Sequence, residues 1–455
     1  MKKAKIYLLY LLPIVLFFSY YPVISLGQNE TMNFELSLPL FWLVLFFFAS
    51  IPDLFQFFTH LNKTRILSLL FPLYLTISII WSPNKPRAIL TAGVFWLVVF
   101  AIISIIQTFK DKNVVKNTTL KTRIVKIFLI STSVICVFCW LQCLLDSLGV
   151  NHETTLLCPG CTYQIFGFPH PNGFAIEPQF MGNLLLAPSV LVLYLLIIRK
   201  RKLYAFLSLL FTSTLFLTLS RGAIYSFIIG IAFFIVYYLI HKQKRALIAI
   251  PIIIVSALIS FLAQGIFSEL SPANETFYSG IAKSVHQLSL GAIDIRQKPA
   301  EESSKEPEQP EDSRKEEAQF NGYIESSTTM RLSLNEYALN TWSKTPTIAI
   351  FGTGIGGAGM TVAQTFENFS PKEIIHNEYL SLLLEFGILG CILLIFPIFL
   401  FIKTIFKNRL GWLFAITLAF ALSILFFSGL PNALHIFIFP ALLLFLSPAI
   451  TTSKS

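Results

Sequence analysis

Charge is scarce in this 455-residue sequence, because only 13% of its residues are Asp, Glu, Lys or Arg while 55% are hydrophobic. Soluble domains average about 25% charged residues. A chain with half that charge lacks the polar surface of an ordinary water-soluble enzyme. The net charge of +10 also has no folded basic domain to carry it, which argues against a nucleic-acid partner.

Long apolar runs of about 16 to 25 residues fill the space that charge leaves, and runs of this length are typical of helices that cross the bilayer. The first run follows Lys2 and Lys3 without a small-residue cleavage site, so we expect a retained helix. The sequence predicts an all-α, polytopic membrane protein with about twelve transmembrane helices. The expected spans are residues 6–26, 37–58, 66–81, 88–107, 125–148, 179–198, 203–219, 223–240, 246–264, 379–402, 410–429 and 435–450.

Basic residues cluster after every second expected span. Of the 34 basic residues, 22 lie in these clusters and at the termini, where Asp53 and Asp111 are the only acids. The positive-inside rule makes this side cytoplasmic, so both termini are expected inside a cytoplasmic (inner) membrane. The clusters are Lys63 and Arg65; residues 110–126; residues 199–202; residues 242–245; and residues 403–409.

The chain divides into three expected parts: helices one to nine over residues 1–264, a large extracytoplasmic loop over 265–378, and helices ten to twelve over 379–455. Within the loop, residues 297–318 contain eight acids, four bases and no aromatic or β-branched residue. Such a segment buries too little apolar surface to fold, so we expect a disordered insertion. Residues 329–345 carry apolar side chains near helical spacing, which predicts an amphipathic helix.

Two charged groups stand at the outer boundary of the predicted bundle. Arg221 lies in the short junction between spans seven and eight, where its planar fork of donors suits a phosphate. The alternative is a turn arginine that reaches lipid headgroups. Glu177 immediately precedes span six and is a candidate general base. The alternative is an interfacial acid that the helix dipole favours.

A glycine-rich run, FGTGIGGAG, covers residues 351–359, shortly after Arg331. Glycines such as Gly354 let backbone N–H groups approach an anion closely. A flexible loop explains the run equally well. It is not a dinucleotide fingerprint, because no strand and helix surround it and no P-loop lysine follows.

His376 closes the long loop just before span ten, which begins near Tyr379. Histidine changes charge near neutral pH, so His376 is a candidate for moving a proton or bonding a diphosphate. A helix cap is the alternative. Glu385 lies inside an apolar run, where a carboxylate needs a partner or a wet cavity. A structural hydrogen bond within the bundle is the alternative for Glu385.

Cys158 and Cys161 form a CPGC sequence in an expected outer loop. The spacing suits a disulfide, a pair of free thiols or half of a metal site. No second CxxC completes a zinc tetrad, so we predict no metal site here.

Several of these motifs together resemble the O-antigen ligase and O-antigen polymerase superfamily of bacterial envelope proteins. They are SRGA at 220–223, the region of Arg331, GTGIGG at 352–357 and HNEYLSLLLEFGILG at 376–390. EPQFMG at 177–182 is similar to the Glu-Pro element of that family. The layout of about twelve helices, with a large outer loop between helices nine and ten, is similar to its GT-C-like ligases. The acidic insertion departs from the family pattern, and the motifs do not separate ligase from polymerase.

The resemblance implies a membrane glycosyltransferase in surface polysaccharide biosynthesis, including lipopolysaccharide. It would move a glycan from an undecaprenyl-diphosphate carrier to lipid A-core or another lipid-linked glycan, at the outer face of the membrane. The implied partners are this donor, a glycan or lipid acceptor and membrane lipids, with no nucleic acid. The resemblance implies no metal, no cofactor and no nucleotide sugar.

Specific residues match the implied chemistry. Arg221 and Arg331 would bind the diphosphate, because preorganised cations stabilise the charge that develops on it. His376 and Glu177 are the candidate catalytic residues, for proton transfer. With one base and no evident covalent nucleophile, we expect an inverting single displacement. Candidate supporting residues are Tyr379, Glu385 and Gly354.

A flippase or transporter of lipid-linked oligosaccharide is the alternative function. Transporters commonly carry ionisable groups near the bilayer midplane. Here the candidates lie at the outer boundary, and Glu385 is the clearest acid within a span. A purely structural scaffold would leave Arg221, Arg331 and His376 without a shared purpose.

Overall fold

The structure is a computed structural model that describes residues 2–28, 33–110, 118–150, 162–165, 168–271, 276–290, 292–293, 295, 329–366, 369–372, 374–427 and 433–452. Two predicted features lie outside these residues: the CPGC pair Cys158 and Cys161, and the acidic insertion at 297–318. The disulfide and the disorder therefore stay predictions.

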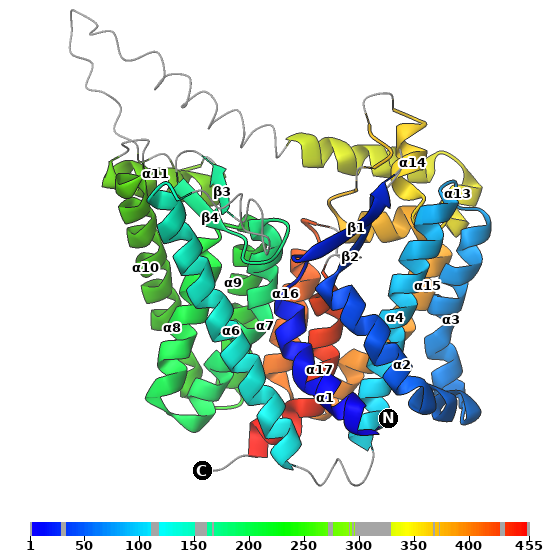
Figure 1. Ribbon diagram of the computed structural model, residues 1–455, viewed down its shortest axis with the longest axis horizontal. Helices are drawn as coiled ribbons and strands as arrows, with labels where there is room; N and C mark the ends of the chain where they lie inside the picture. Colours follow the sequence, from blue (N-terminus) through cyan, green and yellow to red (C-terminus); the bar gives the residue numbers. More distant parts are fainter. Residues whose placement is uncertain are drawn as a thin grey trace, which may run out of the picture.

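The described chain is a bundle of helices with two short β-hairpins (Figure 1). The first half contains α1 (Lys2–Phe17), α2 (Leu38–Thr59), α3 (Lys63–Ile77), η1 (Ser78–Ile80), α4 (Lys85–Lys110), α6 (Thr118–Ser147), α7 (Pro178–Arg199), α8 (Lys202–Leu217) and α9 (Arg221–Ile240). The second half contains η2 (Lys244–Ile248), α10 (Ala249–Leu270), α11 (Phe277–Leu288), a helix over residues 329–343, α13 (Pro346–Phe351), α14 (Ala358–Ala363), α15 (Glu378–Lys407), α16 (Gly411–Ser423) and α17 (Leu434–Thr452).

The hairpins pair β1 (Val23–Gln28) with β2 (Asn33–Ser37), and β3 (Thr162–Ile165) with β4 (Phe168–Pro171), both antiparallel. Sequence periodicity did not predict either hairpin. The expected first span, residues 6–26, is too long, because α1 ends at Phe17 and β1 begins at Val23. The apolar run continues from the helix into the strand, and hydropathy alone does not separate the two.

Nine of the described helices are long and apolar enough to cross a membrane. This confirms the prediction of a mainly helical, polytopic membrane protein. Three shorter apolar helices accompany them, at Ala4–Phe17, Lys202–Leu217 and Gly411–Ser423. The count of twelve, the three-part division of the chain and the position of the large loop stay predictions.

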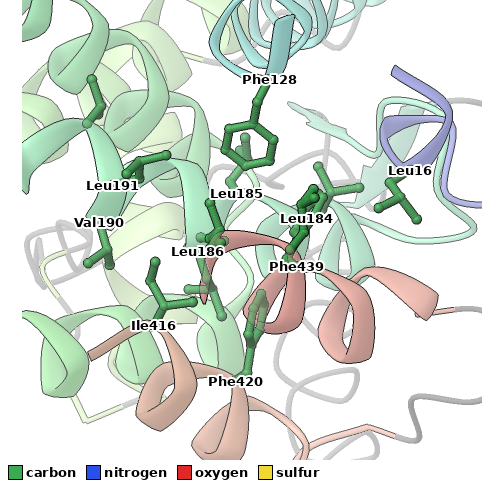
Figure 2. Packing of buried hydrophobic residues seen from close by; sticks show 14 of the residues in the cluster. Leu16, Phe128, Leu184, Leu185, Leu186, Val190, Leu191, Ile416, Phe420 and Phe439 are labelled. Atoms are coloured by element: carbon green, nitrogen blue, oxygen red, sulfur yellow. The ribbon is translucent and has the colours of Figure 1, made fainter. Parts of the chain in front are cut away.

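Helix α7 forms the centre of the largest hydrophobic core. Its successive residues Leu184, Leu185 and Leu186 point in different directions around the helix, and all three are fully buried. Figure 2 shows them packed with Phe128 from α6 and Phe439 from α17. A helix that is apolar on every side must be surrounded by apolar material. For α7 that material is protein. The packing of α7 at the centre of the bundle therefore fixes the position of its first turn.

The two ends of the bundle differ in composition. Helix α1 begins and α17 ends at the lower end of Figure 1, which we call the termini end. The hairpins, α11 and α14 lie at the opposite end, which we call the hairpin end. The basic clusters that follow α2, α7, α9 and α15 fall at the termini end, as their predicted grouping on one side requires. Which end faces the cytoplasm stays a prediction.

Candidate functional site

The helix over residues 329–343 carries Arg331 at the hairpin end. Its Leu334 and Ala338 are buried in a cluster with Val362 of α14 and Leu384 of α15. Apolar residues four apart lie on one face of a helix, so this packing confirms the predicted amphipathic helix. The buried face anchors the helix to the bundle and thereby fixes the position of Arg331.

Arg331 contacts the segment that begins α7. Its Nη2 donates a hydrogen bond to Oε1 of Gln179 at 3.2 Å. Nε2 of Gln179 in turn donates to the carbonyl oxygen of Phe426 at 3.0 Å. The amide of Gln179 is therefore held at both ends, so that its oxygen faces Arg331.

Glu177 occupies the residue before α7, but its side chain makes no capping hydrogen bond to that helix. Burial raises the pKa of Glu177, while the positive charge of Arg331 opposes this with a smaller effect. The carboxylate thus interacts electrostatically with Arg331 and does not cap the N-terminus of α7. A raised pKa makes Glu177 a stronger proton acceptor than an ordinary glutamate.

His376 experiences the same arginine. Burial lowers the pKa of His376, and the positive charge of Arg331 lowers it further. The imidazole is therefore neutral at neutral pH, which is the form that accepts a proton. Capping of α15 falls instead to Asn377, whose Oδ1 accepts hydrogen bonds from N of Tyr379 at 3.1 Å and N of Leu380 at 3.2 Å.

Arg221 is the first residue of α9 and is half-buried. The next residue, Gly222, packs against Phe426: a Cβ added at Gly222 would lie 3.0 Å from Cβ of Phe426. Gln179 hydrogen-bonds to the carbonyl of the same Phe426. Phe426 therefore lies between the start of α9 and the pair formed by Gln179 and Arg331.

The glycine-rich run directs its N–H groups at α15. N of Gly354 donates to the backbone oxygen of Glu385 at 2.9 Å. The side-chain carboxylate of Glu385 accepts hydrogen bonds from the backbone N–H groups of Gly356 and Ala358. A run of N–H groups that converge on an anion is a nest, and here the protein itself supplies the anion. The partner that an acid in an apolar run requires is thus provided.

Two glycines allow the run and α15 to touch at the backbone. Gly387 interrupts α15 with φ 60 and ψ −171. A Cβ added there would lie 2.3 Å from O of Ile350. Gly352 has φ 75, and a Cβ added there would lie 2.3 Å from O of Glu385. Both positions combine a left-handed backbone with contact too close for any side chain, so both require glycine.

Tyr74 of α3 closes the same junction from another side. Its hydroxyl donates to the carbonyl oxygen of Phe351 at 2.7 Å and lies 3.1 Å from that of Phe386. One side chain thereby bridges the end of α13 and the kink in α15.

Arg87, near the start of α4, was missed by the sequence analysis. Its positive charge lies near the carboxylate of Glu385, and its Nη1 donates to the carbonyl oxygen of Pro371 at 3.3 Å. Arg87 thus links Glu385 to the loop that carries His376. The signal was available, because Arg87 is an ionisable group at the edge of an apolar run.

The structure places five of the predicted residues in two groups, together with residues that were not predicted. We call Glu177, Gln179, Arg331 and His376 the arginine cluster, and Arg87, Gly354, Gly356, Ala358 and Glu385 the glycine cluster. The predicted residues Arg221 and Tyr379 belong to neither group. Sequence reasoning also missed Gln179, although a polar residue in the first turn of an apolar helix is a readable signal.

Tyr379 is exposed and donates from its hydroxyl to the carbonyl oxygen of Ala421 at 2.8 Å, which ties α15 to α16.

Comparison with known proteins agrees with the resemblance seen in the motifs. Residues 205–395 match the family model described as O-antigen ligase. No curated protein matches the chain. The matched range includes Arg221, Arg331 and His376, whereas Glu177 lies before it. The match supports membership of the O-antigen ligase and polymerase superfamily and a ligase-like or polymerase-like role in surface glycan synthesis.

Proposed function

From the O-antigen ligase match over residues 205–395, we propose that the protein is a membrane glycosyltransferase. It transfers a glycan from an undecaprenyl-diphosphate carrier to lipid A-core or another lipid-linked glycan, at the outer face of the cytoplasmic membrane. One observation carries the proposal. Arg331 hydrogen-bonds to Gln179, two residues after Glu177, and its charge lowers the pKa of both Glu177 and His376, so one fixed cation acts on two candidate proton acceptors.

In the proposed reaction, the acceptor hydroxyl oxygen attacks the anomeric carbon of the donor sugar. The bond between that carbon and the diphosphate oxygen breaks, and its electron pair leaves with the diphosphate. The hydroxyl proton passes to a base, for which neutral His376 is the first choice and Glu177 the second. A single displacement of this kind inverts the configuration at the anomeric carbon.

The leaving diphosphate gains negative charge as the bond breaks. Arginines already fixed in place stabilise that charge without reorganising during the reaction. Gln179 and the buried face of the helix over residues 329–343 hold Arg331 in position. Arg221 supplies the second cation from the start of α9. We propose that these arginines do the work without a metal ion.

Glycan electrophoresis tests the proposal. A deletion strain is complemented with the wild-type gene or with Arg331→Ala, Arg221→Ala or His376→Ala. Lys344→Ala is the matched control, because this exposed cation directly follows the far end of the helix that carries Arg331. We expect the three site variants to lose surface glycan at normal protein level while the control keeps it.

The same gels separate the alternatives. Loss of all attached glycan, with long lipid-linked chains on the outer face, identifies a ligase. Loss of only the long chains, with a single repeat still attached, identifies a polymerase. If lipid-linked glycan accumulates on the cytoplasmic face instead, the protein is a transporter and the transferase proposal is wrong.

A further inference from the structure

A pocket of about 470 Å³ lies at the termini end of the bundle, at the far ends of two helices that begin near the arginine cluster. Helix α7 starts after Glu177 and α9 starts at Arg221, and the chain segments that follow both helices line the pocket. A 22-residue helix such as α7 is about 33 Å long. The pocket is therefore separated from the arginine cluster by about the thickness of the bilayer core.

Cations dominate the lining of this pocket. They come from three connected pieces of chain: the residue after α7, the residues after α9, and η2. The four are Lys200, Lys242, Lys244 and Arg245.

These cations have no acidic neighbour along the chain. No Asp or Glu occurs between Glu177 and Glu269, a stretch that contains α7, α8, α9, η2 and most of α10. Among the described residues that line the pocket there is no carboxylate either. Like charges that converge on one cavity repel one another, and an anion in the cavity removes that repulsion.

The remaining wall of the pocket is apolar. Ile197 and Ile198 of α7 line it, and Ile198 is partly exposed. Close by along the chain, Ile240 at the end of α9 and Ile248 at the end of η2 also expose their side chains. Exposed aliphatic residues at the end of membrane-spanning helices face acyl chains. The pocket thus offers cations to a headgroup and an apolar flank to a lipid tail.

We propose that this pocket binds the phosphate group of an anionic phospholipid from the leaflet at the termini end. Basic pockets between transmembrane helices are suited to such headgroups, and the volume falls within the range of about 300–1,000 Å³ that is usual for ligand pockets. The apolar flank favours a lipid over free phosphate. The site lies away from the arginine cluster and does not depend on the transferase proposal.

Native mass spectrometry of the purified full-length protein in neutral detergent tests this site. Phosphatidylglycerol is titrated in one arm, phosphatidylcholine in a second and inorganic phosphate in a third. The test variant is Lys200→Gln/Lys242→Gln, and a charge-retaining Lys200→Arg/Lys242→Arg variant checks that folding is intact. Each basic residue near a membrane surface adds enough attraction that losing two is expected to weaken phosphatidylglycerol binding about thirtyfold.

The matched control is Lys407→Gln/Arg409→Gln, which removes the same charge at the end of α15. Arg409 has the same left-handed backbone, with φ 54, as Lys200 has with φ 54 and Lys242 with φ 61. We expect this control and the arginine-retaining variant to bind phosphatidylglycerol as the wild type does. Equal weakening in the control, equal binding of phosphatidylcholine, or binding of inorganic phosphate without binding of phosphatidylglycerol would each overturn the proposal.

Discussion

The arginine cluster and the glycine cluster each place a carboxylate near an arginine at the hairpin end, yet the two carboxylates are treated differently. Glu385 accepts hydrogen bonds from two backbone N–H groups in addition to the nearby charge of Arg87. Glu177 makes no capping bond although it precedes a helix. A carboxylate whose hydrogen bonds are satisfied stabilises structure, whereas one left to a neighbouring cation stays available for chemistry.

The two clusters also depend on each other. Arg87 bonds to the carbonyl of Pro371 in the loop that carries His376, and Leu384 packs with Leu334 of the helix that carries Arg331. The glycine cluster thus holds the two segments that the arginine cluster needs. This difference predicts that changes in the arginine cluster reduce activity, and that changes in the glycine cluster reduce stability first.

The largest expected effect is that of Arg331→Ala on the rate of transfer. Removal of one preorganised charge donor typically lowers the catalytic rate about 10²-fold to 10³-fold. We expect that loss with an unchanged melting temperature. Other residues hold Arg331 in place, and Arg331 itself contributes little to the packing of its neighbours. Transfer is measured with purified protein and a lipid-linked donor. A fall in melting temperature as large as that of the glycine-cluster variants would remove the distinction between the clusters.

Gly387→Ala tests, through stability, the backbone contact between α13 and α15 that adjoins the glycine cluster. The added Cβ would lie 2.3 Å from O of Ile350 at a residue with φ 60, so we expect a loss of about 2–4 kcal/mol of unfolding free energy. Thermal unfolding in detergent measures it. Gly93→Ala is the control, since nothing lies within 4 Å of a Cβ at that position in α4. Equal melting temperatures for the two variants would show that the backbone contact is unimportant.

Glu385→Ala and Glu177→Ala compare the two carboxylates directly. Loss of Glu385 leaves two backbone N–H groups without their acceptor, which costs about 1–3 kcal/mol. Glu177→Ala is expected to leave the melting temperature unchanged and to slow transfer. Glu269→Ala, an exposed acid at the end of α10, controls for loss of negative charge. The comparison fails if Glu177→Ala is the less stable variant.

Tyr74→Phe removes the hydroxyl that bridges α13 and α15. The carbonyl groups of Phe351 and Phe386 lose their shared donor, so we expect a loss of about 1–2 kcal/mol. Tyr379→Phe removes one hydrogen bond at an exposed residue and is expected to cost less, about 0.5 kcal/mol. Melting temperatures of both variants check the order, and a larger effect for Tyr379→Phe would contradict it.

The smallest expected effect is a shift in the pH dependence of transfer. The base must be unprotonated, so activity is lost as the pH falls through its pKa. Burial and Arg331 lower the pKa of His376, which places this loss at a lower pH than for an ordinary histidine. Arg331→Gln removes the positive charge near His376, so the pKa of His376 rises. As the pH falls, the residual activity of this variant is therefore lost at a higher pH than the activity of the wild type.

The pKa of Glu177 moves in the same direction in Arg331→Gln, because Arg331 also lowers that pKa. The shift of the acid limb is therefore expected for either base. Rates of the variant across the pH range, compared with Lys344→Gln, measure it. An acid limb at the wild-type pH would show that Arg331 controls neither group.

Sequence alone predicted the membrane class, the alternation of basic clusters and the amphipathic helix before α13. Each depends on neighbours along the chain: twenty apolar residues in a row, charges at the ends of runs, and apolar side chains four apart in a helix. It also identified His376 and Glu177 as candidates, because charge at the edge of an apolar run is unusual and must be compensated. Arg331 was identified through the motifs that resemble the O-antigen ligase and polymerase superfamily.

Only the tertiary structure decided which of these candidates meet. Gln179 and Arg331 are 152 residues apart in the chain, and their hydrogen bond exists because α7 is buried at the centre of the core while Leu334 and Ala338 pack elsewhere on the bundle. The backbone N–H groups of the glycine-rich run could bind any anion. The packing of this run against α15 brings the carboxylate of Glu385 to them. The local sequence pattern shows which polar and charged groups need a partner. Contacts between segments far apart in the chain determine which group that partner is.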